Sequence, residues 1–216
     1  MRVFQLDSYV LLLSGKDCFK FLDGLSTNKV ESTCTTVFTK SNAKIIDMVE
    51  VIVVGENIAL VGHNKYKTNL VDHLNSRILQ QDVSMRDISQ FNNVYISFDD
   101  YPKTDNITVV STFRGWIIVA PTSFTIESTL TLKAFNEYRV EHIIPHQEYE
   151  ITPSRHPFNC RLESLVHESK GCYIGQEILT RMRSRGKMGK SLIRIEGSPD
   201  DATTIGATHS LAIRKT

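Results

Sequence analysis

The chain has 216 residues, 41 % of them apolar, and a formal net charge of +1 at pH 7. This length is enough for one large domain or two small ones with a real core, and the composition is that of a globular protein. The near-zero charge gives no global bias toward nucleic acid. No apolar run approaches the length of a membrane span, and the start lacks a signal-peptide pattern. We therefore expect an intracellular protein, cytoplasmic or in an organelle matrix, with no membrane partner.

The first half of the chain alternates strand and helix patterns. Residues 9–14 and 44–55 are apolar runs typical of strands, and 57–62 predicts a hairpin partner for 44–55 across Gly55 and Glu56. Residues 16–25 carry apolar side chains at helical spacing. Residues 64–79 predict an amphipathic helix with Asn64 as its N-cap.

The second half repeats this arrangement. Short apolar stretches predict four strands, at 83–89, 93–98, 107–112 and 115–120, the last two joined as a hairpin around Phe113 and Arg114. Helices are expected at 127–141 and 175–184, separated by an irregular, proline-containing piece at 145–157. Two closing strands are expected at 190–197 and 207–215.

Two blocks of strands, helix and strands indicate an α+β fold with antiparallel sheets. We expect one α+β region at 1–185 with sub-lobes at about 1–90 and 91–185. The remaining segment, 186–216, is too small to fold alone and must pack on the rest.

The four cysteines are Cys18, Cys34, Cys160 and Cys172. They form no CxxC pair and stand at no structural-zinc spacing with histidines. A chain this long and cysteine-poor is not a disulfide scaffold, so free thiols in a reducing compartment are expected.

Residues 170–177 read KGCYIGQE and place Cys172 between two glycines, shortly before a predicted helix start. The helix dipole and Lys170 would both favour the thiolate, and the glycines would let the backbone wrap a ligand. The alternative is a buried structural cysteine, which the pattern alone favours. No histidine is fixed beside the thiol by sequence, so a Cys–His nucleophile is not supported.

Residues 138–148 hold His142 and His146, four positions apart, but Pro145 breaks the helix between them and argues against a metal site. Arg139 and Glu141 are candidates for a polar pair at the helix end. Carboxylates such as Glu141 and Asp47 can accept paired N–H donors, as on the amide-like edge of a pterin. Asp47 stands in an apolar strand, either exposed at an edge or buried for a specific reason.

From Arg181 to Arg194 the chain carries six basic residues and no acidic one: Arg181, Arg183, Arg185, Lys187, Lys190 and Arg194. One interpretation is a solvated segment. The other is an anion site for a polyanionic ligand tail, RNA or an acidic partner.

Four stretches resemble one known family. KGCYIGQE with Arg181 matches the signature of the YgfZ group of folate-binding proteins, in the wider family of the glycine-cleavage T-protein (GcvT, aminomethyltransferase). Residues 21–30 resemble its N-terminal segment, with Lys29 in place of the usual acidic residue. Residues 42–54 resemble the strand with the folate-facing aspartate, and 138–145 resemble R-x-E-x-G-x-P, with Ile143 in place of glycine.

The resemblance implies α+β lobes around a central channel that binds tetrahydrofolate or a derivative, and a C-terminal barrel reduced here to two strands. It implies Cys172 as a functional thiol, no metal site, and a set of folate-binding residues: Asn28, Asp47, Arg139, Glu141, Asn159, Lys170, Tyr173, Gln176, Glu177 and Arg181.

The function implied is iron–sulfur cluster assembly or repair through folate-linked one-carbon chemistry, with cluster enzymes or assembly proteins as partners. Whether the protein is itself an enzyme stays open. The alternatives are an aminomethyltransferase of the glycine cleavage system and, third, a non-enzymatic RNA- or protein-binding module that uses the basic run. The run has no interleaved aromatic residues for base stacking, so nucleic acid is the least favoured partner.

Overall fold

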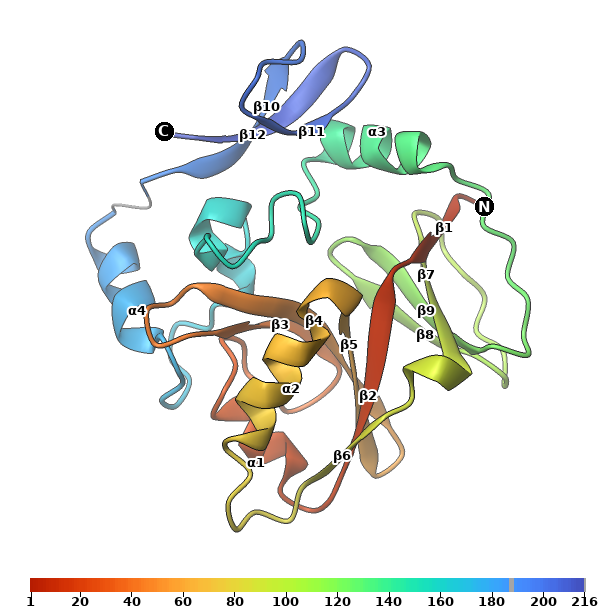
Figure 1. Cartoon of the computed structure of the whole chain (residues 1–216), viewed down its shortest axis with the longest axis vertical. Helices are drawn as coiled ribbons and strands as arrows, with labels where there is room; N and C mark the ends of the chain where they lie inside the picture. The colour runs from red at the N-terminus through yellow and green to blue at the C-terminus, as the bar shows by residue number, and fades with distance from the viewer. Residues whose placement is uncertain (187–188, 216) are drawn as a thin grey trace. The chain divides into compact units, whose positions relative to one another are not determined.

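The computed structural model describes residues 1–186 and 189–215 (Figure 1). Lys187, one of the basic residues singled out in the sequence, lies outside the described residues. In the described part of the chain, no helix is long and apolar enough to cross a membrane.

Three antiparallel sheets and a few short helices make up the fold, as the α+β prediction requires. The four-stranded sheet has the order β1-β7-β9-β8, the five-stranded sheet β3-β4-β5-β2-β6, and the C-terminal sheet β10-β12-β11. Strands of the first two sheets span β1 (Val3–Leu6), β2 (Ser8–Ser14), β3 (Cys34–Thr39), β4 (Ile45–Val54), β5 (Asn57–His63), β6 (Ser84–Asp87), β7 (Asn92–Ser97), β8 (Thr108–Thr112) and β9 (Gly115–Pro121).

The C-terminal sheet consists of β10 (Ser191–Glu196), β11 (Ala202–Ile205) and β12 (His209–Arg214). The α-helices are α1 (Cys18–Asp23), α2 (Lys67–Asn75), α3 (Leu132–His142) and α4 (Gln176–Ser184). Four short 3₁₀ turns complete the described elements: η1 (Asn64–Tyr66), η2 (Ser89–Phe91), η3 (Pro157–Cys160) and η4 (Glu163–Leu165).

Both hairpins predicted from the sequence are present. Val54 pairs with Asn57 across the Gly55-Glu56 turn, and Thr112 pairs with Gly115 across Phe113-Arg114. Their strong apolar runs and turn residues are local signals, which sequence alone can read.

Three strands were missed, and each is short. β1 and β11 have four residues each, and β3 has the sequence CTTVFT, whose threonines hide a strand that is nevertheless almost wholly buried. The prediction of two closing strands is therefore wrong, because β11 pairs with β12 to make a third.

The start of the helix at 64–79 differs from the prediction. The 3₁₀ turn η1 precedes α2, and His63 is its cap, accepting a hydrogen bond from the backbone N–H of Lys65 at 3.3 Å. Asn64 instead donates from Nδ2 to the Asp7 carboxylate at 2.6 Å. Asn64 is thus not the cap, because its amide has a stronger, charged acceptor.

Helix α3 begins at Leu132 rather than at 127 because the preceding backbone pairs with β1. The N–H groups of Thr129 and Leu130 both donate to the Val3 carbonyl at 2.9 Å. The helix ends where Ile143 adopts a positive φ of 53° and the Ile144 N–H donates back to the Arg139 carbonyl. This is the left-handed position that glycine usually takes at a helix end, so a β-branched residue is strained there.

The chain divides into two units that interleave along the sequence. The first unit comprises Met1–Cys18, Ser32–Thr35 and Val49–Phe135, and the second comprises Phe19–Glu31, Thr36–Met48 and Asn136–Thr216. The continuous lobes 1–90 and 91–185 and the separate segment 186–216 stay predictions.

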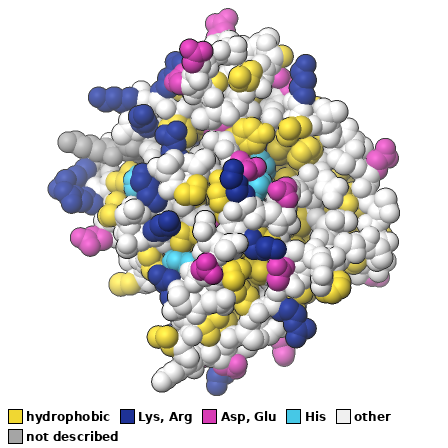
Figure 2. Space-filling view, viewed as in Figure 1, with side chains coloured by type: hydrophobic (Ala, Val, Ile, Leu, Met, Phe, Trp, Pro, Cys, Tyr) yellow, Lys and Arg dark blue, Asp and Glu magenta, His cyan; other side chains and the backbone are white. Residues whose placement is uncertain are grey.

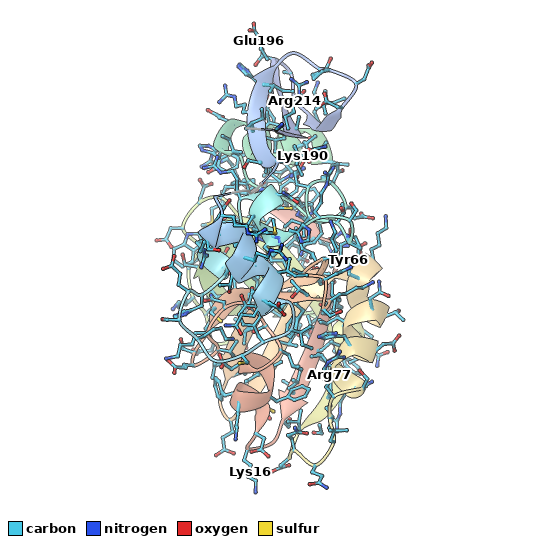
Figure 3. All side chains as sticks on the ribbon, turned by 90° about the vertical axis from the view of Figure 1, so that its left-hand side faces the viewer. Lys16, Tyr66, Arg77, Lys190, Glu196 and Arg214 are labelled. Carbon is cyan, nitrogen blue, oxygen red and sulfur yellow. The ribbon has the colours of Figure 1, made fainter. Side chains whose placement is uncertain are left out.

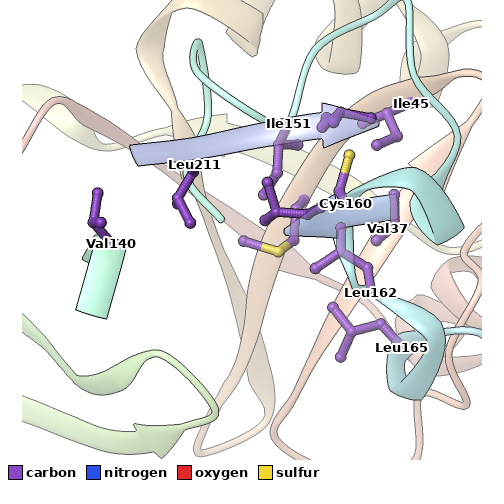
Figure 4. Close-up of a cluster of buried hydrophobic side chains, with 11 residues drawn as sticks. Val37, Ile45, Val140, Ile151, Cys160, Leu162, Leu165 and Leu211 are labelled. Atoms are coloured by element: carbon purple, nitrogen blue, oxygen red, sulfur yellow. The ribbon is translucent and has the colours of Figure 1, made fainter. Parts of the chain in front are cut away.

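Each unit has its own hydrophobic core. In the first unit, Phe135 stacks on Phe4 with ring centroids 4.2 Å apart, beside buried residues of β2, β4, β5, β7 and β9. In the second unit, Val37 and Ile45 pack with Cys160, Leu162 and Leu211 (Figure 4). Since Leu211 belongs to β12, the C-terminal sheet shares the core of the second unit.

Candidate functional site

Every residue expected to bind folate, and Cys172, belongs to the second unit. We call residues 170–177 the signature turn. Its last two residues begin α4, a nine-residue helix whose N-cap is Gly175 at φ +87°. Thr39 donates from Oγ1 to the Ile174 carbonyl at 2.6 Å, which fixes the turn against the end of β3.

Gly175 is required at this place for two reasons. Its backbone is left-handed, and a Cβ there would lie 2.9 Å from the Lys40 carbonyl oxygen and 3.1 Å from the Ala43 Cα. The first contact is closer than a Cβ atom tolerates, and the second is tighter than most Cβ contacts. Gly171 has ordinary φ and no atom within 4 Å of such a Cβ. The two glycines of the signature thus have different roles.

The Lys170 side chain is 1 % exposed and points away from solvent. Its Nζ donates to the carbonyl oxygens of Asp23, Ser26 and Asn28 at 2.6, 2.9 and 2.7 Å, and lies 3.0 Å from the Asp23 carboxylate. An ammonium has three N–H groups, so these contacts use its donors. Lys170 therefore holds the 23–28 segment in place.

The remaining signature residues divide between interior and surface. Tyr173 is buried beside Phe158 and Leu179, and burial raises the pKa of its phenol. Gln176 accepts the Tyr173 backbone N–H at 3.3 Å. Glu177 and Arg181 are exposed on α4.

Among the four cysteines, Cys172 is the exposed one. Cys18 and Cys160 are buried, and Cys34 is half-buried. The interpretation of Cys172 as a buried small hydrophobe is therefore wrong, because the turn before α4 leaves its side chain in solvent. Burial raises the pKa of the Cys160 thiol to about 12, and that thiol donates to the Glu150 carbonyl at 3.2 Å.

Iodoacetamide is expected to alkylate Cys172 of the native protein well before Cys160, since the thiolate is the reacting form and access is needed. Peptide mass spectrometry over a time course measures the order. A Cys172→Ser variant is the control and should lose the fast modification. Equal rates for Cys172 and Cys160 in the folded protein would contradict this assignment.

Asp47 on β4 is fully buried, which decides between the two interpretations of its place in the strand. Its Oδ1 accepts the Met48 N–H at 2.8 Å and the Gln147 Nε2 at 3.4 Å. Gln147 also donates to the Met48 carbonyl at 2.9 Å. Sequence reasoning missed Gln147, because nothing in its neighbourhood shows that the 146–151 segment returns to β4.

Arg139 pairs with Glu150, not with Glu141 as the sequence suggested. Residues two apart on a helix point in different directions, so Glu141 faces solvent while Arg139 is 1 % exposed. The Arg139 guanidinium donates to Glu150 at 2.8 Å, to the Ile144 carbonyl at 3.2 Å and to Thr204 at 2.9 Å. Two further bonds go to Asn136. All five guanidinium N–H groups are thus used within the second unit.

Glu150, also missed from the sequence, is completely buried and joins three elements. Besides Arg139, its carboxylate accepts the hydroxyls of Thr203 and Thr204 on β11 at 2.7 and 2.6 Å and the His146 N–H at 3.0 Å. This network ties β11 and the 146–150 segment to α3.

Asn159 in η3 bridges two segments through its side-chain amide. Its Oδ1 accepts the His156 N–H at 3.2 Å, and its Nδ2 donates to the carbonyl of Lys190 at 2.8 Å. Lys190 stands at the base of the C-terminal sheet, and Glu196 at its outer tip (Figure 3). Asn159 thus helps to fix the segment that enters β10.

The basic run at 181–194 is not a uniform strip. Arg183 donates to the carbonyls of Val166 and Glu163 at 2.8 and 3.3 Å and lies over the Phe158 ring. Arg194 contacts the Glu141 carbonyl at 3.3 Å. Arg181 and Arg185 instead face solvent. Figure 2 shows Lys and Arg side chains on the left of the view, the side on which α4 lies.

Comparison with known proteins shows a similarity in structure. No protein-family model and no curated protein matches the sequence. Among solved structures, the chain is similar to the crystal structure of glycine cleavage system aminomethyltransferase T from Bartonella henselae, with a TM-score of 0.78 and 11 % sequence identity. The likeness covers 99 % of this chain and 78 % of that one. The chain therefore has a GcvT-like α+β fold built from antiparallel sheets.

Proposed function

We propose that this chain is a tetrahydrofolate-binding protein of the YgfZ type that acts in iron–sulfur cluster assembly or repair through folate-linked one-carbon chemistry. The proposal is carried by the position of Cys172, which is exposed on a signature turn that buried contacts hold in place. The chain around it has a GcvT-like fold over nearly its whole length. Its partners would be cluster-containing enzymes or cluster-assembly proteins.

The second unit carries polar side chains of the kinds that can bind the two ends of a folate. An exposed carboxylate such as Glu141 can accept the paired N–H groups of a pterin, and a guanidinium such as Arg181 attracts the carboxylates of the glutamyl tail. We propose that the exposed side chains of Glu141, Glu177 and Arg181 contact the ligand.

The internal members of the set would act differently. Five of these side chains are engaged within the protein, and for them we propose a role in shaping the walls of the site: Asp47, Arg139, Asn159, Lys170 and Tyr173. Asn28 and Gln176 are half-buried and stay in the proposed contact set.

Tetrahydrofolate titrated into the protein by isothermal calorimetry tests the ligand. We expect saturable binding that a Glu141→Gln variant weakens, since the amide keeps the shape of this exposed side chain but removes one of its paired acceptors. If millimolar tetrahydrofolate produces no heat of binding, folate is rejected as the ligand.

The Cys172→Ser variant tests the thiol. Because Cys172 is exposed, we expect unchanged stability and folate binding but failure to restore the activity of cluster enzymes in a deletion strain. A Cys34→Ser variant serves as the thiol control and should restore that activity. Full restoration by Cys172→Ser would remove the thiol from the function.

The second candidate is an aminomethyltransferase of glycine cleavage, which the fold shared with the Bartonella henselae aminomethyltransferase favours. Incubation with an aminomethylated lipoyl carrier protein and tetrahydrofolate should then release ammonia and methylene-tetrahydrofolate. Folate binding without this turnover would favour the YgfZ-type function.

A further inference from the structure

A pocket of about 420 Å³ opens on the second unit, beside α4, whose ribbon faces the viewer in Figure 3. It is lined by His156, Ile178, Arg181, Met182 and Arg185. This volume lies within the range of small-molecule sites in proteins.

The apolar part of the pocket is formed by two side chains that pack on buried residues. Ile178 and Met182 are four residues apart on α4, so they share one face of the helix. Both pack on a buried cluster that includes Phe158, Tyr173 and Leu179. An apolar group seated on Ile178 and Met182 would therefore meet a surface that the core holds in place.

The polar part of the pocket is cationic. Arg181 and Arg185 are also four residues apart and lie beside this apolar pair. Within residues 1–186 and 189–215, neither guanidinium has a side-chain hydrogen bond or ion pair, whereas Arg183 between them is engaged with two carbonyls. No carboxylate lines the pocket.

His156 adds a polar group but no charge at neutral pH. Its Nδ1 lies 3.0 Å from the Ala43 carbonyl and so donates to it, which fixes the ring. Burial lowers the pKa of this imidazole below its usual value. The hydrogen bond to Ala43 offsets part of this lowering, and Lys44 adds a smaller one. The positive charge of the pocket thus comes from the two guanidiniums.

We propose that this pocket binds an amphipathic anion, that is, a carboxylate or phosphate group carried on an apolar alkyl or aryl body. The anionic group would pair with Arg181 and Arg185, which can donate in bidentate fashion, and the apolar body would lie on Ile178 and Met182. This inference goes beyond the proposed folate function. Although Arg181 also belongs to the proposed folate set, the experiment below contains no folate, so its outcome is independent of that function.

Octanoate and octyl phosphate are the probes, with binding measured by calorimetry and by chemical-shift changes of the α4 amides. We expect saturable binding of one or both at this helix, and no comparable binding of octyltrimethylammonium or of acetate. Equal binding of the cationic probe, equal binding of acetate, or no binding at millimolar probe would overturn the proposal.

An Arg181→Gln/Arg185→Gln double variant tests the cationic part. The loss of two charge-assisted hydrogen bonds should weaken probe binding about tenfold or more. The matched control is Arg86→Gln/Arg161→Gln, which removes two exposed arginines elsewhere and changes the net charge equally. An equal loss of affinity in the control would show a general charge effect and reject the site.

Discussion

Replacing Arg139 with methionine is expected to destabilise the protein by about 3–5 kcal/mol, because a carboxylate that is completely buried loses its cation. Glu150 would keep the Thr203 and Thr204 hydroxyls and the His146 N–H as donors, but no positive charge. The Ile144 carbonyl and the Thr204 hydroxyl, which accept hydrogen bonds from Arg139, would also lose this donor. Urea unfolding followed by circular dichroism measures the change.

The matched control is the ion pair between Arg214 and Asp201, which is bidentate but exposed. Arg214→Met should change stability little, since water solvates the remaining carboxylate. Glu150→Gln in the Arg139→Met background should recover part of the loss by removing the buried charge. If Arg139→Met proves no more destabilising than Arg214→Met, the network around Glu150 is not the anchor of the C-terminal sheet that we describe.

Replacing Gly175 with alanine is expected to cost about 2–5 kcal/mol, the sum of a left-handed backbone without glycine and of overpacking. The added Cβ would lie 2.7 Å from the Thr39 Oγ1 and 2.9 Å from the Lys40 carbonyl oxygen. Thr39 cannot turn away without losing its hydrogen bond to the Ile174 carbonyl. The turn would therefore lift from the end of β3. Thermal unfolding gives the loss in stability, and iodoacetamide labelling reports any change at Cys172.

Gly171→Ala provides the control within the same motif. Its φ is not left-handed and no atom lies within 4 Å of the added Cβ, so we expect nearly unchanged stability. Similar losses for the two variants would mean that the glycines of the signature turn act alike, contrary to the structure.

The residues of the signature turn fall into two groups. Some hold the turn in place through contacts inside the protein, whereas Cys172 is exposed to solvent. Lys170, Tyr173 and Gly175 hold the turn to the 23–28 segment, to the Phe158 cluster and to the end of β3. Cys172 is left exposed by the same arrangement. Variants of the first group should therefore act through folding, and variants of Cys172 through function.

The sequence by itself determined the features that depend on neighbours along the chain. The hairpins at 44–62 and 107–120 follow from apolar runs with turn residues between them, and helix α4 follows from its pattern after Gly175. The resemblance of residues 170–177 to a known signature likewise singled out Cys172, because the resemblance lies in consecutive residues.

Only the tertiary structure decided what these residues contact. The carbonyls that hold Lys170 lie more than 140 positions away in sequence, and the Arg139 partner is Glu150 rather than the nearer Glu141. Of the strands that the sequence missed, β1 pairs with the distant β7, whereas β3 and β11 are short segments that pair with the next strand along the chain, β4 and β12. Local sequence patterns predict helices, strands and turns because these depend on neighbouring residues. The hydrogen-bond partners of a buried charged group come from distant segments, so only the folded structure shows which they are.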